Sequence, residues 1–294
     1  MFNFNKIKLV IWDLDETFWS GVLSEGDIQV SERNIQLIRR LTDIGIVNSI
    51  CSKNDLEPVK EKLEQIGILD QFVFLSVNWE PKGGRIKQLI EDMQLRSVNV
   101  LFIDDNPSNL QEAKFFCPEL MTALPDEIPA LIEESLCCEK KDIDHKRLQQ
   151  YKILEEKHAQ RKAFSSNEDF LYSSNIRVEF GEDCVENLDR IHDLVWRSNQ
   201  INFTKVRSTK EELLELFGDK EAKCGYVRVK DRFGDYGITG FYALKEGRLI
   251  HFCFSCRTLG MGIEQYVYEK LGRPDLTVVG DVVSNLSGYK IPGW

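Results

Sequence analysis

The chain has 294 residues, 42% of them hydrophobic, and a formal net charge of −10. Its length predicts about two domains, each large enough for its own core. The acidic charge excludes nonspecific nucleic-acid binding, and no apolar run approaches the ~20 residues that span a membrane. The N-terminus lacks the apolar core of a signal peptide, and the eight scattered cysteines are typical of reduced thiols. We therefore expect a cytoplasmic protein without nucleic-acid or membrane partners.

The first predicted strand covers residues 9–12, Leu-Val-Ile-Trp, and two carboxylates, Asp13 and Asp15, follow it. A run this apolar predicts a central strand of a parallel sheet, covered on both faces. In open α/β sheets, ligands bind beyond the carboxyl ends of such strands. Two carboxylates this close repel each other, and a bound cation relieves that repulsion. The alternative is a solvated acidic turn.

The chain as far as residue 116 alternates between predicted strands and helices. Apolar runs predict further strands over 46–50, 72–77 and 98–103. Apolar residues at helical spacing predict helices between Ser31 and Gly45, and over 57–66, 84–93 and 108–116. This alternation predicts a doubly wound parallel sheet, which is an α/β fold.

Polar side chains stand at the ends of the four predicted strands. They are, in chain order, Asp13 and Asp15, Ser52, Lys82, and Asp104 with Asp105. Their order and types resemble the haloacid dehalogenase (HAD) superfamily of aspartate-based phosphotransferases. The four motifs of that superfamily are D-x-D-x-T, a Ser or Thr, a Lys and a closing acidic pair. The resemblance implies a HAD-type sheet domain that acts on a phosphorylated small molecule.

The resemblance implies a catalytic role for each carboxylate. Asp13 is the expected nucleophile, which attacks phosphorus to give an aspartyl-phosphate. Asp15 is the expected proton donor to the leaving oxygen, and it later activates water. Mg²⁺ is the implied cofactor, held by an Asp13 carboxylate oxygen, the Asp15 backbone carbonyl and Asp105.

The remaining motif residues have supporting roles in the same resemblance. Ser52 and Lys82 are expected to bind the phosphoryl oxygens. Asp104 is expected to support the waters of the metal without binding it directly. Thr17 is expected to fix the loop through a local turn hydrogen bond.

A closer resemblance is to the FkbH-like group of this superfamily, subfamily IIIC. It is carried by WDLDETFWSGVL, CSKND, NWEPK and FIDDNP, and further on by SNQINFT, DRFGDYGITG and SCRTLGMGIE. Members of that group take a glyceryl unit from 1,3-bisphosphoglycerate and load it onto an acyl carrier protein with a phosphopantetheine arm. An enzyme cysteine carries the acyl group between them. The resemblance implies the same chemistry, with this or a similar acyl donor.

Such chemistry needs a nucleophilic thiol, and Cys51 directly precedes Ser52 at the mouth of the predicted site. A thiolate there could accept an acyl group from an acyl phosphate. The alternative is that Cys51 is a small buried residue at a strand end. Cys256 is the second candidate for the acyl-carrying thiol. Cys253 and Cys256 form a lone C-x-x-C, which does not predict a zinc site without a second ligand pair.

Three parts of the chain are expected: a HAD-like domain over 1–138, a connecting helix over 139–163 and a second domain over 164–294. The connecting helix is highly charged and is expected to be largely solvated. Its two histidines, His145 and His158, have no evident partner in the sequence and are interpreted as surface or packing residues.

The second domain is predicted to be α+β. Strands are expected over 176–180, 225–229, 237–244, 249–255 and 276–283, and helices over 185–197 and 263–271. Arg257, Gly260 and Gly262 form an R-x-x-G-x-G that resembles the acyl-CoA pyrophosphate loop of the acetyltransferases called GNAT. The alternative is a tight strand-to-helix turn. The expected fold is short of the helix and final strands that usually complete a GNAT domain, so we expect this part to bind a pantetheine arm or a carrier.

Two functional interpretations therefore stay open. One is a loader of acyl carrier proteins, and the other is a simple phosphatase with a noncatalytic C-terminal domain. No insertion between Thr17 and Lys82 is large enough for a cap domain. Trp12, Trp19 and Trp79 are expected either to line a substrate pocket or to pack between the domains.

Overall fold

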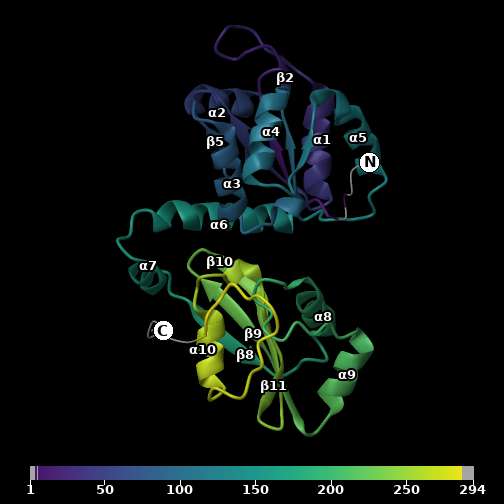
Figure 1. The fold of residues 1–294 in the computed structure, drawn as a ribbon, viewed down its shortest axis with the longest axis vertical. Helices are drawn as coiled ribbons and strands as arrows, with labels where there is room; N and C mark the ends of the chain where they lie inside the picture. The colour runs from purple at the N-terminus through teal and green to yellow at the C-terminus, as the bar shows by residue number, and fades with distance from the viewer. Residues whose placement is uncertain (1–3, 5, 287–294) are drawn as a thin grey trace. The chain divides into compact units, whose positions relative to one another are not determined.

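The computed structural model describes residue 4 and residues 6–286, and the chain divides into two compact units, 1–159 and 160–294 (Figure 1). Of the helices in the described part of the chain, none has the length and apolar character needed to cross a membrane.

The N-terminal unit is built on a five-stranded parallel sheet with the strand order β5-β4-β1-β6-β7. The strands are β1 (Leu9–Trp12), β4 (Val47–Ser52), β5 (Ser76–Val77), β6 (Val100–Ile103) and β7 (Met121–Ala123). The predicted α/β fold with a parallel sheet is confirmed. The strand expected over 72–77 is shorter, because Phe72 makes only an isolated bridge to Asn48. The short edge strand β7 was not predicted.

Helices cover both faces of this sheet. They are α1 (Glu32–Asp43), α2 (Leu56–Gln65), α3 (Lys82–Asp92), α4 (Pro107–Phe116), α5 (Ile128–Leu136) and α6 (Lys146–Arg161). Side chains of α1, α2 and α5 share one hydrophobic cluster with Val10 and Trp12. Those of α3, α4 and α6 share the other with Leu9 and Ile11. Because side chains alternate along a strand, β1 is buried on both faces.

The chain order creates a switch point beside β1. From β1 the chain passes to β4 and then β5 on one side, and it later returns to β6 and β7 on the other. The direction of winding therefore reverses between β1 and β6. In open α/β sheets the crevice outside the carboxyl ends of the strands at such a point is where ligands bind. A small antiparallel pair, β2 (Trp19–Ser20) and β3 (Gln29–Val30), lies in the connection that leaves β1.

Helix α6 is less solvated than its composition predicts. Leu148, Tyr151 and Leu154 pack against the hydrophobic cluster that α3 and α4 share with the sheet. The Glu155 carboxylate accepts a hydrogen bond from the backbone N–H of Phe74. The apolar side chains, spaced three residues apart, form a stripe that is buried although the rest of the helix is charged.

The histidines near α6 have partners that the sequence does not reveal. His145 Nε2 lies 2.8 Å from Asp43 Oδ1, and His158 Nε2 lies 3.3 Å from Asp92 Oδ1. Both carboxylates belong to the ends of helices far along the chain. Both side chains are partly exposed, and His158 also packs against Phe74, so the interpretation as surface or packing residues holds, with partners that only the structure reveals.

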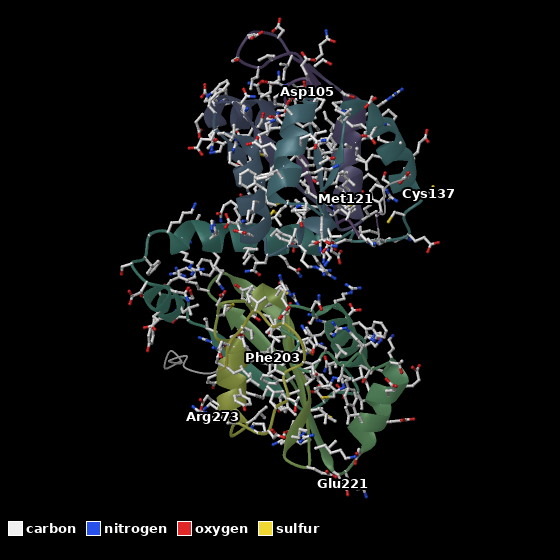
Figure 2. All side chains as sticks on the ribbon, viewed as in Figure 1. Asp105, Met121, Cys137, Phe203, Glu221 and Arg273 are labelled. Carbon is white, nitrogen blue, oxygen red and sulfur yellow. The ribbon has the colours of Figure 1, made fainter. Side chains whose placement is uncertain are left out.

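The C-terminal unit contains a four-stranded antiparallel sheet with the order β11-β10-β9-β8. Its strands are β8 (Arg177–Gly181), β9 (Ala222–Asp231), β10 (Gly234–Lys245) and β11 (Arg248–Phe254). Its helices are α7 (Asn167–Ser173), α8 (Leu188–Arg197), α9 (Lys210–Gly218) and α10 (Ile263–Lys270). Phe203 lies in the hydrophobic cluster that packs α10 against the sheet (Figure 2).

Two features of this unit differ from the sequence prediction. Residues 276–283 form no strand, and only Asp275 pairs with β11, through a single bridge to Arg248. Their backbone instead bonds to the segment before β9, where Val279 N donates to Phe203 O over 2.8 Å. Helices α7 and α9 were not predicted. The run Leu-Thr-Val-Val-Gly-Asp-Val-Val over 276–283 is apolar enough to predict a strand, but an apolar run does not by itself specify a pairing partner.

Candidate active site

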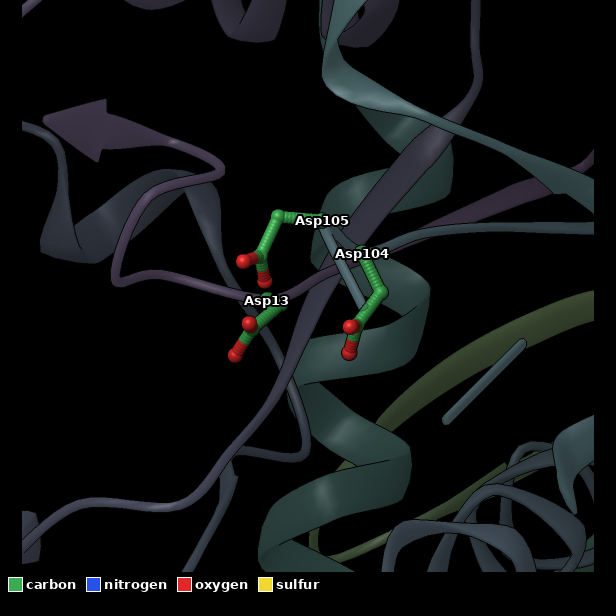
Figure 3. Close-up of side chains that lie close together, drawn as sticks. All are labelled: Asp13, Asp104 and Asp105. Atoms are coloured by element: carbon green, nitrogen blue, oxygen red, sulfur yellow. The ribbon is translucent and has the colours of Figure 1, made fainter. Parts of the chain in front are cut away.

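The polar strand ends of the N-terminal unit meet at the switch point. Asp13 is the first residue after β1, and Asp104 and Asp105 follow β6, its direct neighbour. Ser52 ends β4, the neighbour of β1 on the other side. One oxygen from each of Asp13, Asp104 and Asp105 lies within 4.8 Å of the others, and Figure 3 shows the three side chains close together.

Lys82 lies at the centre of this arrangement. It is the first residue of α3, and its Nζ lies 2.7 Å from Asp13 Oδ1 and 2.6 Å from Asp104 Oδ2. Only 2% of the Lys82 side chain is exposed. The ammonium group therefore neutralises carboxylates from two adjacent strands in a place where water does not screen them.

Asp104 is fully engaged by protein groups. Its Oδ1 accepts hydrogen bonds from Asn106 N and Asn109 Nδ2, both over 2.9 Å, and its Oδ2 accepts from Lys82. The first turn of α4 presents these donors, because Asn106 caps the helix and Pro107 begins it. Asp104 is therefore held rigidly, and it positions Lys82 rather than facing solvent.

Asp15 projects from the loop after β1. Its Oδ1 accepts from Trp19 Nε1 over 2.8 Å and from Leu23 N over 3.2 Å. Its Oδ2 accepts from Asn54 Nδ2 over 2.9 Å, and the same amide lies 3.3 Å from Ser52 Oγ. Asn54 thus connects the carboxylate of Asp15 to the end of β4.

Thr17 has a different role from the one predicted. Its Oγ1 accepts a hydrogen bond from the backbone N–H of Asp105 over 2.9 Å, across 88 positions of the sequence. The expected local turn bond is therefore wrong for this side chain. The hydroxyl instead ties the loop after β1 to the loop after β6, and this holds Asp13 and Asp105 near each other.

Burial and charge shift the pKa values of this cluster. Burial raises the pKa of Asp13, and Lys82 acts in the opposite direction. Burial alone would lower the pKa of Lys82, but Asp13 and Asp104 outweigh it and raise it. Burial and the neighbouring Asp104 raise the pKa of Asp105. A second cation at this place would relieve the repulsion between the carboxylates.

Three supporting residues were missed by sequence reasoning. Asn54 and Asn109 hold Asp15 and Asp104, as described above. Arg85 lies one turn after Lys82 on α3, and its guanidinium donates to Ser52 O over 3.0 Å and to Ser76 Oγ over 3.0 Å. The available signal was their position after the strands. Arg85 and Asn109 lie in the first turns of α3 and α4, and Asn54 lies in the loop between β4 and α2, next to the carboxyl edge of the sheet.

The three tryptophans near the predicted strand ends do not share one environment. Trp12 and Trp19 are buried in the core of the N-terminal unit, and Trp12 Nε1 donates to Asn48 Oδ1 over 3.1 Å. Both pack within the N-terminal unit, and Trp19 also contacts the site through its bond to Asp15. Trp79 is 60% exposed, and its Nε1 donates to Asp55 Oδ1 over 2.9 Å.

Cys51 is the residue before Ser52, but its thiol is fully buried. It shares the hydrophobic cluster of α3 and α4, and burial raises its pKa to about 11. A strand residue points to the face opposite from that of its neighbour, so adjacency in sequence does not place the thiol next to the Ser52 hydroxyl.

The R-x-x-G-x-G segment lies in the C-terminal unit between β11 and α10. Arg257 belongs to a short 3₁₀ turn, Cys256–Thr258, and its Nε lies 3.2 Å from Ser255 Oγ. Gly260 and Gly262 both have φ of 76°, and Gly262 is the residue before the first turn of α10. Cys256, in the same turn, is partly exposed. The left-handed backbone at both glycines favours glycine over other residues.

Comparison with protein-family models gives no match to this chain, and comparison with curated proteins gives none either. Solved structures do match. The N-terminal part of protein BF1531 from Bacteroides fragilis, which contains a phosphatase domain complexed with Mg, is 27% identical with a TM-score of 0.40. That match covers 45% of this chain and 39% of the Bacteroides chain, so the similarity spans less than half of each.

Two further solved structures match at lower identity. The cobalt-bound deoxy-D-mannose-octulosonate 8-phosphate phosphatase from Haemophilus influenzae is 17% identical, with 44% of this chain and 89% of that one covered and a TM-score of 0.36. A HAD-superfamily hydrolase from Ehrlichia chaffeensis is 12% identical, with 45% and 98% covered and a TM-score of 0.37. Of these three structures, one contains a phosphatase domain with Mg bound, one is a phosphatase with cobalt bound, and one is a HAD-superfamily hydrolase.

Proposed function

We propose that the N-terminal unit is a Mg²⁺-dependent phosphatase of the HAD type that acts on a small phosphate ester. The observation that carries this proposal is the position of Lys82, between Asp13 and Asp104, with Asp105 within 4.8 Å of both carboxylates at the switch point of the sheet. A buried nucleophilic carboxylate next to a fixed cation is what an attack on an anionic phosphoryl group needs.

Asp13 is the nucleophile in this proposal. Its carboxylate attacks phosphorus, the bond to the leaving oxygen breaks, and an aspartyl-phosphate forms on Asp13. Lys82 lowers the repulsion between this carboxylate and the incoming phosphoryl group. Asp15 gives a proton to the leaving oxygen and later takes one from the water that hydrolyses the intermediate. Ser52, at the end of β4, donates to a phosphoryl oxygen.

The carboxylates also fit the implied metal ion. Asp13 and Asp105 offer hard oxygen ligands close together, and together with the backbone carbonyl of Asp15 they would hold Mg²⁺. When bound, the ion neutralises charge on the transferring phosphoryl group. Asp104 is not proposed as a ligand, because its two oxygens already accept hydrogen bonds from Lys82, Asn106 and Asn109.

The test is phosphate release by Asp13→Asn. We expect the rate to fall by more than about 10³-fold, because loss of a nucleophile removes the whole covalent route. Phosphate is measured in steady state with p-nitrophenyl phosphate and a panel of small phosphate esters, with and without Mg²⁺. Asp70→Asn is the matched control, because Asp70 comes after α2 in the sequence and its side chain is exposed. Turnover retained by Asp13→Asn, or full activity in EDTA, would refute the proposal.

We extend the proposal to acyl transfer on the basis of the FkbH-like sequence resemblance. In this extension the donor is 1,3-bisphosphoglycerate or a similar acyl phosphate, and an enzyme thioester passes the acyl unit to an acyl carrier protein. The R-x-x-G-x-G segment with Arg257, Gly260 and Gly262 is then the proposed pantetheine loop. The thiol is Cys51 or Cys256, and partial exposure favours Cys256, because burial raises the pKa of Cys51 to about 11.

Intact mass separates these interpretations. The enzyme is incubated with 1,3-bisphosphoglycerate, Mg²⁺ and a holo acyl carrier protein, using wild type, Cys51→Ala and Cys256→Ala. Acyl transfer predicts an adduct on the enzyme that one substitution removes, followed by a mass increase on the carrier. Free phosphate without any adduct would instead support a simple phosphatase with a noncatalytic C-terminal domain.

A further inference from the structure

Trp79 is a large exposed side chain at the carboxyl edge of the parallel sheet. It lies two residues beyond β5, and Val77, the last residue of that strand, pairs with Ser52 at the end of β4. Its side chain is 60% exposed, although tryptophan is highly buried on average in folded proteins. The reaction proposed for Asp13 uses no part of this indole.

The loop that carries Trp79 is fixed to the end of β4. The backbone N–H of Asn78 donates to Ser52 O over 3.3 Å, and the Arg85 guanidinium donates to the same oxygen over 3.0 Å. The guanidinium also donates to Asn78 O over 2.9 Å and to Glu80 O over 3.1 Å. Hydrogen bonds therefore tie both neighbours of Trp79 to the residue that is proposed to bind a phosphoryl oxygen.

The indole itself is oriented by Asp55. Trp79 Nε1 donates to Asp55 Oδ1 over 2.9 Å, which fixes the polar end of the ring and leaves much of its apolar surface in water. Asp55 directly follows Asn54, whose amide donates to Asp15 Oδ2 over 2.9 Å. The residue that anchors the indole is therefore next in the chain to the residue that contacts the proposed proton donor.

We propose that Trp79 binds the leaving group of the phosphate ester, and that this group contains a ring with a flat apolar face, either a sugar ring or an aromatic ring. This inference rests on the proposed phosphatase function. The leaving oxygen must lie at Asp15 to receive its proton, so the rest of the leaving group begins beside Asn54, one residue from the anchor of the indole.

A fixed indole is suited to bind such a ring. Contact between the two flat surfaces removes apolar area of both from water. Because hydrogen bonds already hold the Trp79 loop and the indole N–H, little conformational entropy is lost when the ring binds. An acyclic acyl phosphate would cover little of the indole, so the inference concerns the hydrolysis of phosphate esters.

Steady-state kinetics of Trp79→Ala in the full chain test this inference with three esters. Phenyl phosphate has an aromatic ring, glucose 6-phosphate has a sugar ring, and glycerol 1-phosphate has none. For at least one ring ester KM should rise about tenfold with kcat unchanged, because contact with the indole binds the ground state and the transition state alike. The ester whose KM rises identifies the kind of ring. KM for glycerol 1-phosphate should not change.

Binding of phosphonates, which cannot be hydrolysed, gives a second readout that does not depend on turnover. The ligands are benzylphosphonate, the methylenephosphonate analogue of glucose 6-phosphate, and methylphosphonate, and binding is measured by calorimetry with Mg²⁺. At least one ring phosphonate should bind about tenfold more weakly to Trp79→Ala than to wild type. Methylphosphonate should bind equally to both.

Trp196→Ala is the matched control and should behave as wild type. Trp196 is 49% exposed and its Nε1 donates to Ser208 O over 2.8 Å, but it belongs to the C-terminal unit. The inference would be overturned if Trp79→Ala and wild type bound every ring ligand equally, if neither ring phosphonate bound the wild type, or if KM for glycerol 1-phosphate rose as much as that for the ring esters. Ring phosphonates that bind through Trp79, without release of phosphate from any ester by wild type, would instead contradict the proposed phosphatase function.

Discussion

Replacing Lys82 with Met should strongly destabilise the N-terminal unit. Lys82 is 2% exposed and neutralises Asp13 and Asp104 at 2.7 and 2.6 Å. Methionine fills a similar volume, so the main loss is the positive charge. Removing one partner of a buried ion pair costs about 3 to 5 kcal/mol, because the remaining charge is left uncompensated. Domains are stable by only about 5 to 15 kcal/mol, so much of the margin would be lost.

The pH dependence of this loss has a definite sign. Without Lys82, the pKa of Asp13, which burial already raises, rises further. A folded carboxyl with a raised pKa binds a proton that the unfolded chain has released, so stability falls as the pH rises from the unfolded value of about 4 through the folded value. The difference between Lys82→Met and wild type should therefore be small near pH 4 and largest at neutral pH.

Urea unfolding in EDTA, followed by fluorescence at several pH values, measures this difference. Lys60→Met is the matched control, since Lys60 pairs with Glu57 at 3.1 Å on the surface, where the two side chains are 40% and 75% exposed. An exposed pair of this kind contributes little. Equal stability of Lys82→Met and wild type at pH 7 would refute the view that two ionised carboxylates depend on this ammonium group.

Two further predictions concern the C-terminal unit. His251 is buried beside Ser208 at 3.1 Å, and burial lowers its pKa to about 4. Because the unfolded chain binds a proton at this histidine more readily than the folded protein does, the free energy of unfolding decreases as the pH falls. The wild-type protein should lose up to about 3 kcal/mol of this free energy between pH 6.5 and 4. His251→Gln should not show this pH dependence in urea titrations. At Gly225, an added Cβ would lie 2.3 Å from Tyr242 Oη. Gly225→Ala should therefore cost about 1 to 3 kcal/mol in thermal unfolding, whereas Gly218→Ala, which meets nothing within 4 Å, should not destabilise.

Local sequence patterns are enough to predict the parallel sheet of the N-terminal unit and the residues at its carboxyl edge. The apolar runs that precede Asp13 and Asp104 are local signals, and each was found as a strand, β1 and β6. Parallel strands present their carboxyl ends at one edge, so the order of the motifs was enough to expect a shared site. The proximity of Asp13, Asp104 and Asp105 follows from this rule.

Contacts between side chains that are distant in sequence could not be predicted from those patterns. Thr17 binds the backbone of Asp105, and Asn54 joins Asp15 to Ser52, although nothing in the local pattern specifies either partner. The burial of Cys51 also depends on which face of β4 the helices cover. Residues 276–283, all within the described part of the chain, form no strand, because an apolar run forms one only where another strand is available to pair with it. Periodicity specifies an element's exposed and buried faces, but its partners are set by contacts between distant segments.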